Sequence, residues 1–193
     1  KPVPRTPVAD LDGYNWMMQR TGMTHQELFA MDADKAADFI IEQYEVIGSD
    51  MVYANAFANG ALRQVMGNGD GSKPALTEPS DIHKFNVDEV FEKTVQHPLF
   101  LAFGKQLEAL NRKIGDEKLI LAFGTGPLTN CAGMLGMEPL MMALHEEPEE
   151  MMAVIDFAVE IFSEIELILN RKQKLLDDKD FCVCFFFDFG KHL

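Results

Sequence analysis

The sequence predicts an α/β fold in which helices alternate with parallel strands. The same pattern occurs over residues 32–55 and again over residues 98–123. In both, apolar residues recur at helical spacing, a glycine ends the helix, and a short apolar strand follows. Residues 181–187 (FCVCFFF) form a continuous apolar run, which is typical of a parallel strand covered on both faces. The chain has 193 residues, 47% of them hydrophobic, so we expect one domain over residues 1–193 with a sizeable core.

The first part of the chain predicts a strand, a turn, a helix and a second strand. Residues 7–9 (PVA) are expected to form the first strand, and a turn rich in Asp, Gly and Asn follows them. Asp32 is a suitable N-cap, and Gly48 is a natural end for the helix that it starts. Apolar residues recur between them at helical spacing: Ala36, Ala37, Ile40, Tyr44 and Ile47. Residues 51–54 then predict a short buried strand.

A long excursion separates this unit from the next one. Residues 67–86 are rich in Gly, Asp, Pro and Ser, and an extra short strand is expected at residues 75–77. Pro98 opens a second helix that Gly115 closes, and a strand is predicted over residues 119–123.

The last part of the chain predicts a long helix and a buried strand. Pro148 starts the helix, and the apolar stripe along it comprises Met151, Ile155, Ala158, Phe162, Ile165 and Leu169. The strand is the apolar run at residues 181–187. Methionines at helical spacing are expected to fill the core: Met134, Met137, Met141, Met142, Met151 and Met152.

Charge and cysteine content exclude several classes of protein. The 17 Lys and Arg residues against 31 Asp and Glu give a net charge of −14, which disfavours a nucleic-acid partner. The longest apolar run is far too short to span a bilayer, so no membrane partner is expected. Three cysteines do not make a disulfide framework, and this predicts a reducing, cytoplasmic location.

Candidate site residues follow the predicted strands, because functional groups of parallel α/β folds collect at the carboxyl ends of strands. The predicted substrate-binding rim comprises Asp10, Asp12, Tyr14, Asn15, Trp16, Asn55, Phe57, Thr125, Thr129 and Asp188. Asp10 and Asp12 are equally suited to forming a turn. Cys182 and Cys184 point to one face of a strand, but their apolar flanks favour burial, and no complete zinc site with His192 is predicted. No catalytic residue is assigned.

One part of the chain resembles the central segment of the uroporphyrinogen decarboxylase superfamily: residues 121–130 (LAFGTGPLTN), followed by residues 133–138 (GMLGME) and 142–144 (MAL). In that superfamily a Gly-x-x-Pro-x-Thr turn comes after a barrel strand, and two short helices follow the turn. Residues 48–53 with Asn55 resemble the second-strand region of that superfamily, and residues 5–8 resemble the first strand. The resemblance implies a (β/α)8 TIM-barrel-like fold, whereas the alternation of helices and strands by itself also permits a small doubly wound sheet. Such barrels typically have about 250 residues. We therefore expect an incomplete barrel, the N-terminal half to two-thirds, truncated at the C-terminus.

Three departures from the family pattern bear on activity. Residues 10–16 (DLDGYNW) lack the arginines with which the decarboxylases of this superfamily bind substrate carboxylates. Asn55 stands where those decarboxylases have a pyrrole-binding aspartate, and Gly133 stands near the position of their active-site tyrosine. The resemblance therefore implies the corrinoid- and coenzyme-M-dependent methyltransferase branch, with methyl transfer between a small donor or thiol and a corrinoid. Its zinc is held by a His-x-Cys motif that this chain lacks, so whether the chain is an active enzyme stays open.

The cofactors implied by resemblance are zinc and a corrinoid, and the implied partner is a small molecule, a corrinoid or a corrinoid protein. Two alternatives remain: uroporphyrinogen decarboxylation in tetrapyrrole biosynthesis, and a non-catalytic binding or assembly protein that retains half a barrel. An incomplete barrel exposes sheet edges, and such edges promote association. We therefore expect a homo-oligomer, in the form of a symmetric dimer.

Overall fold

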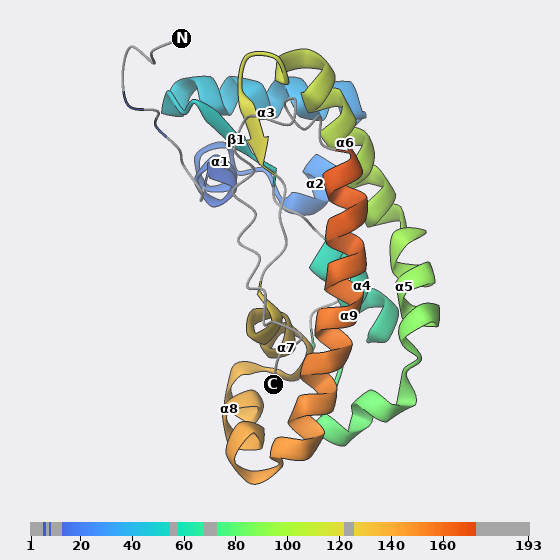
Figure 1. Ribbon diagram of the computed structural model, residues 1–193. Coiled ribbons are helices and arrows are strands. Elements are labelled where there is room, and N and C mark those ends of the chain that lie inside the picture. Colours follow the sequence, from blue (N-terminus) through green and yellow to red (C-terminus); the bar gives the residue numbers. More distant parts are fainter. Residues whose placement is uncertain are drawn as a thin grey trace.

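A computed structural model (Figure 1) describes residues 6, 8, 13–54, 58–67, 73–121 and 126–172, and these residues are mostly helical. Two short strands lie among the helices. In chain order the elements are α1 (Gly13–Thr21), α2 (His25–Ala30), α3 (Ala33–Ile47), β1 (Met51–Tyr53), α4 (Ala58–Met66), the 3-10 helix η1 (Pro79–Lys84), α5 (Val87–Val95), α6 (Pro98–Ile114), β2 (Leu119–Leu121), α7 (Pro127–Leu135), α8 (Met137–Glu146) and α9 (Pro148–Lys172).

The predicted helix–glycine–strand unit at residues 32–55 is confirmed in α3 and β1. Oδ1 of Asp32 accepts hydrogen bonds from the backbone N–H groups of Asp34 and Lys35, at 3.1 and 3.3 Å, so two donors of the first turn are satisfied. Gly48 ends the helix in the left-handed conformation at φ 71°. Its N–H bonds to the carbonyl of Tyr44 at 3.0 Å.

The two strands pair in parallel, with Met51 opposite Leu119 and Tyr53 opposite Leu121. Parallel order is what the predicted α/β alternation requires, so this part of the fold prediction is confirmed. The predicted strand at residues 181–187 lies outside the described residues. Of the predicted strand at residues 7–9 only Val8 is described; its N–H donates to Oδ2 of Asp50 at 2.8 Å, and its carbonyl accepts from the N–H of Asp50 at 2.7 Å. The described residues do not confirm a barrel.

The largest helix interface lies between α3 and α6. Leu107 of α6 is completely buried, as are Ala36, Ala37 and Ile40 of α3. Small buried residues such as Ala36 and Ala37 leave room on α3 for side chains of a neighbouring helix. The amide of Gln106, only 2% exposed, donates from Nε2 to the carbonyl of Leu28 at 2.9 Å and so ties α6 to α2.

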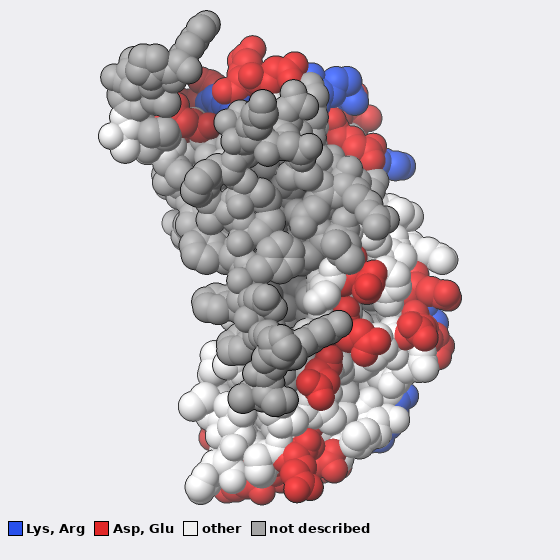
Figure 2. Space-filling model, in the orientation of Figure 1, with Lys and Arg blue, Asp and Glu red and all other residues white. Residues whose placement is uncertain are grey.

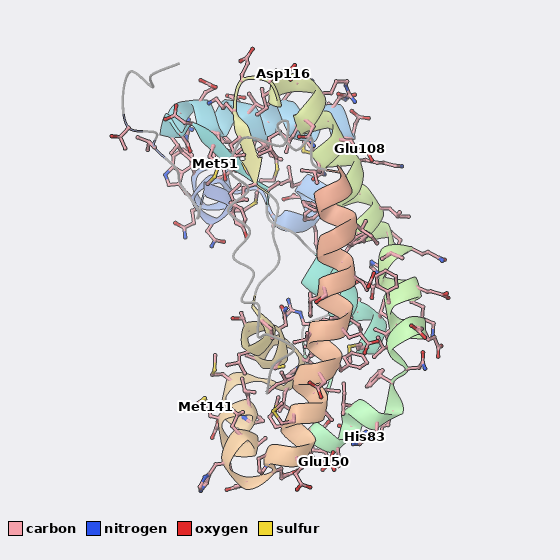
Figure 3. All side chains as sticks on the ribbon, viewed as in Figure 1. Met51, His83, Glu108, Asp116, Met141 and Glu150 are labelled. Carbon is pink, nitrogen blue, oxygen red and sulfur yellow. The ribbon has the colours of Figure 1, made fainter. Side chains whose placement is uncertain are left out.

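The long helix α9 connects the two ends of an elongated molecule (Figure 1). It packs against α5, α7, α8 and η1. Its predicted apolar stripe is largely confirmed, because Met151, Ala158, Phe162 and Ile165 are buried, while Ile155 is only partly buried. At its first turn, Oε2 of Glu150 lies 2.8 Å from Nε2 of His83 in η1 (Figure 3).

Three predictions are wrong. Residues 75–77 form no strand: the chain bends there, and the N–H of Leu76 bonds to the carbonyl of Met134 at 2.9 Å. The turn expected after residues 7–9 extends no further than residue 12, because α1 begins at Gly13. Four of the six core methionines, three on α8 and one on α9, are exposed by 52–65%. Helix α8 packs through Leu140 and Ala143, and its methionines lie on other sides (Met141 is labelled in Figure 3). The four exposed methionines are Met137, Met141, Met142 and Met152.

The described helices include none that is both long enough and apolar enough to span a membrane.

Candidate functional site

A pocket of about 110 Å³ lies between α4, α7 and α9. Its lining combines apolar side chains with one guanidinium, one hydroxyl and one amide. The lining residues are Leu62, Arg63, Thr129, Asn130, Gly133, Met134 and Phe162.

The strands position this pocket. Helix α4 follows β1 and helix α7 follows β2, so the two helices that line the pocket both come directly after the carboxyl ends of parallel strands. Figure 1 shows β2 pointing toward the half of the molecule that holds α7. The pocket therefore lies on the side of the sheet at which parallel α/β folds collect functional groups.

Helix α7 begins at Pro127. Proline suits the first helical position because its backbone carries no N–H that would need a partner. Thr129 is exposed at the third position of α7, whereas Asn130 is buried and its N–H bonds to the carbonyl of Gly126 at 3.0 Å. The N-cap, Gly126, has no side chain with which to cap the helix.

Gly133 contributes empty space to the pocket. A Cβ atom built on Gly133 would meet no atom within 4 Å. The resemblance places a tyrosine near this position, and the glycine here leaves part of the pocket open; Met134 and Phe162, both buried, line the same pocket.

Arg63 is the cation of the pocket. Its Nε is buried and has no hydrogen-bond partner. The described residues offer its guanidinium no ion pair either. A guanidinium stays protonated throughout the physiological range, so the pocket carries a positive charge that the described residues do not neutralise.

The predicted rim residues are only partly described. Thr129 lines the pocket. Asn15 and Trp16 lie on α1 and do not line it; the ring of Trp16 faces the guanidinium of Arg20, 5.2 Å from the ring centroid. Tyr14 belongs to α1, and its side chain is not described. Other predicted rim residues lie outside the described part of the chain: Asp10, Asp12, Asn55, Phe57, Thr125 and Asp188. The rim as a whole stays a prediction.

The sequence prediction missed Arg63, Asn130 and Phe162. A signal for Arg63 was available, because it is the one charged residue between Asp50 and Asp70 and it stands beside apolar Leu62. An isolated arginine in such a segment either extends its guanidinium to solvent or pairs with a buried anion.

Cys131 lies in α7 next to the pocket residues, but its thiol is not a nucleophile. It is completely buried, and burial raises its pKa to about 11. Its Sγ lies 3.9 Å from the carbonyl of Val154. Within the described ranges, no three His, Cys, Asp or Glu side chains group closely enough to hold a metal ion.

We expect Cys131 to resist thiol reagents in the folded protein. With a pKa of about 11, only about one thiol in a thousand is ionised at pH 8, and the thiolate is the reactive form. The measurement is the rate of reaction with an aromatic disulfide reagent in a Cys182→Ser, Cys184→Ser double variant, which leaves Cys131 as its only thiol. Reaction should accelerate sharply in urea, and fast reaction without urea would show that Cys131 is accessible.

Comparison with known protein families gives a match over most of the chain. A family model described as uroporphyrinogen decarboxylase (URO-D) matches residues 1–169. Searches of curated proteins and of solved structures each gave no match.

Proposed function

Because the chain belongs to the uroporphyrinogen decarboxylase family, we propose that it serves methyl transfer between a small donor or thiol and a corrinoid, as in the methyltransferase branch, and not tetrapyrrole decarboxylation. The observation that carries this choice is the size and charge of the pocket between α4, α7 and α9. A volume of about 110 Å³ suits a molecule of a few heavy atoms. Pockets for larger organic ligands have about 300–1,000 Å³.

The charge of the pocket supports the same choice. Uroporphyrinogen carries eight carboxylates, and its recognition requires several cations. The pocket lining contains one cation, Arg63, and the chain as a whole has a net charge of −14. A small substrate with at most one negative group meets less repulsion from such a protein.

In this proposal the residues of the pocket bind and orient the substrate. Phe162 and Met134 provide apolar walls, Arg63 fixes a polar end, and the hydroxyl of Thr129 can donate or accept one hydrogen bond. The described residues do not fit the zinc that the methyltransferase branch uses, since they offer no group of three ligands and Cys131 is protonated. No step of the reaction is therefore assigned to a metal. A corrin ring is far larger than the pocket, so the corrinoid would approach its mouth from outside.

Two parallel assays on the 193-residue chain test the proposal. In the first, methylcobalamin and a small thiol are supplied, and loss of the methyl group is followed by absorbance. In the second, uroporphyrinogen is supplied, and products with fewer carboxylates are separated by chromatography. We expect thiol-dependent demethylation and no decarboxylated product. Decarboxylated product would overturn the proposal, and so would corrinoid binding without demethylation, which would instead indicate a binding protein.

A further inference from the structure

We propose that the pocket between α4, α7 and α9 binds the carboxylate of a small monocarboxylic acid, with Arg63 as the residue that receives it. The inference deepens the proposed function, on which it rests for the role of the ligand, by naming the chemical class of the small substrate. Three observations carry it: the unpartnered Nε of the guanidinium, the composition of the lining, and the charge of the surroundings.

The first observation is the state of Arg63. Leaving a buried donor without a partner destabilises the folded protein, and more so where the group is charged. The buried Nε of Arg63 has no partner, although the polar side chains of Thr129 and Asn130 line the same pocket. The described residues also give its guanidinium no ion pair. A carboxylate in the pocket would supply one, because its two oxygens match the planar fork of a guanidinium and accept two parallel hydrogen bonds.

The second observation is the composition of the lining. Apart from Arg63, Thr129 and Asn130, the pocket is lined by Leu62, Gly133, Met134 and Phe162, so one polar end adjoins an apolar wall. A ligand with one anionic group and a short apolar body satisfies both parts. The empty space at Gly133 leaves room for that body beside Phe162.

The third observation is the charge of the protein. Acidic side chains outnumber basic ones on the face seen in Figure 2, in keeping with the net charge of −14. A dianion or polyanion would be repelled by this field, whereas a monoanion bound against one guanidinium leaves the pocket neutral. The field thus favours a monocarboxylate over a phosphate or a polycarboxylate.

The test uses butyrate as probe and butyramide as its uncharged match. The 193-residue chain, labelled with 15N, is titrated with each compound, and the backbone amide signals of Thr129 and Gly133, which line the pocket and are present in every variant, are followed by NMR. Arg63→Met keeps most of the aliphatic stem and removes the guanidinium. Arg112→Met is the matched control, because Arg112 is an exposed residue of α6 paired with Asp34 and lies outside the pocket lining.

We expect butyrate to bind saturably, with a dissociation constant in the millimolar range that is typical of so small a ligand. Butyramide should bind at least about tenfold more weakly, because it carries no charge to pair with the guanidinium. Arg63→Met should weaken the binding of butyrate by a similar factor, which corresponds to about 1.4 kcal/mol. Arg112→Met should bind butyrate as the parent chain does. Circular dichroism of each variant checks that it is folded.

Three outcomes would overturn the inference: equal binding of butyrate and butyramide, unchanged binding in folded Arg63→Met, or binding of inorganic phosphate in preference to butyrate. Failure of the methyl-transfer assay is a separate result. If butyrate binds through Arg63 but no methyl transfer occurs, the carboxylate site stands and the proposed reaction falls.

Discussion

Replacing Leu107 by alanine is expected to lower the free energy of unfolding by about 2–5 kcal/mol. Leu107 is completely buried on α6, the helix that packs most extensively against α3, whose Ala36, Ala37 and Ile40 are completely buried as well. A packed helical core relaxes only partly into the space that a lost side chain leaves. The cost is therefore the lost burial of the removed carbons together with the cavity that remains.

Leu101 gives the matched control on the same helix. Its side chain is 51% exposed, so Leu101→Ala changes the same atoms with little loss of burial. We expect that variant to stay within about 0.5 kcal/mol of the parent chain. Urea unfolding followed by far-ultraviolet circular dichroism, with equal slopes for the three proteins, measures the difference. Equal costs at the two positions would contradict the assignment of the α3–α6 interface as the core.

The parts of the fold that could be predicted from the sequence are those whose signals are local. Asp32 and Gly48 mark the two ends of α3 by their own hydrogen bonds and backbone conformation, and Pro98 and Pro127 start helices by the same kind of local effect. The parallel order of the two strands could also be predicted from the sequence, because a helical crossover between two apolar strands makes the second strand run in the same direction as the first.

The parts that could not be predicted depend on what each segment packs against. The methionines of α8 have helical spacing, but spacing does not reveal that the side of the helix buried against other elements is the narrow one formed by Leu140 and Ala143. Residues 75–77 have strand-like composition, yet the N–H of Leu76 bonds to the carbonyl of Met134 in α7. Tertiary packing overrides composition in both places.

The candidate site shows the same division. Thr129 was predicted because it follows a strand within the turn and helix that resemble a known family. Arg63 was not predicted, since its importance lies in the absence of a partner for a buried Nε, and this follows only from the packing of α4 against α7 and α9. Unsatisfied polar atoms are properties of the folded chain.

The second large loss of stability is expected on replacing the buried amide of Gln106. Gln106 of α6 is 2% exposed; its Nε2 donates to the carbonyl of Leu28 and its Oε1 has no partner. Gln106→Glu keeps the shape of the side chain but replaces a donor by a group that, when ionised, can only accept. An ionised carboxylate would face the carbonyl oxygen of Leu28 in a place closed to water, so the new carboxyl should stay protonated in the folded state, with its pKa raised.

The sign of the resulting pH dependence follows from that raised pKa. Below the ordinary glutamate pKa of about 4.3 the new carboxyl is protonated in both states, and ionisation contributes nothing. As the pH rises further, the unfolded chain loses this proton while the folded chain keeps it, so stability falls by about 1.4 kcal/mol per pH unit until the folded pKa is reached. At pH 7 we expect a loss of about 3–4 kcal/mol relative to the parent chain.

The control is Gln106→Leu, which loses the bond to Leu28 but also removes the unsatisfied Oε1 and introduces no charge. It should cost about 1 kcal/mol, by an amount that does not vary with pH. Urea unfolding of the three proteins between pH 5 and pH 7.5 gives the comparison, with the pH dependence of the parent chain subtracted. A penalty for Gln106→Glu that stays constant across this range would show that the new carboxyl reaches water, and that α6 and α2 do not enclose it as the structure describes.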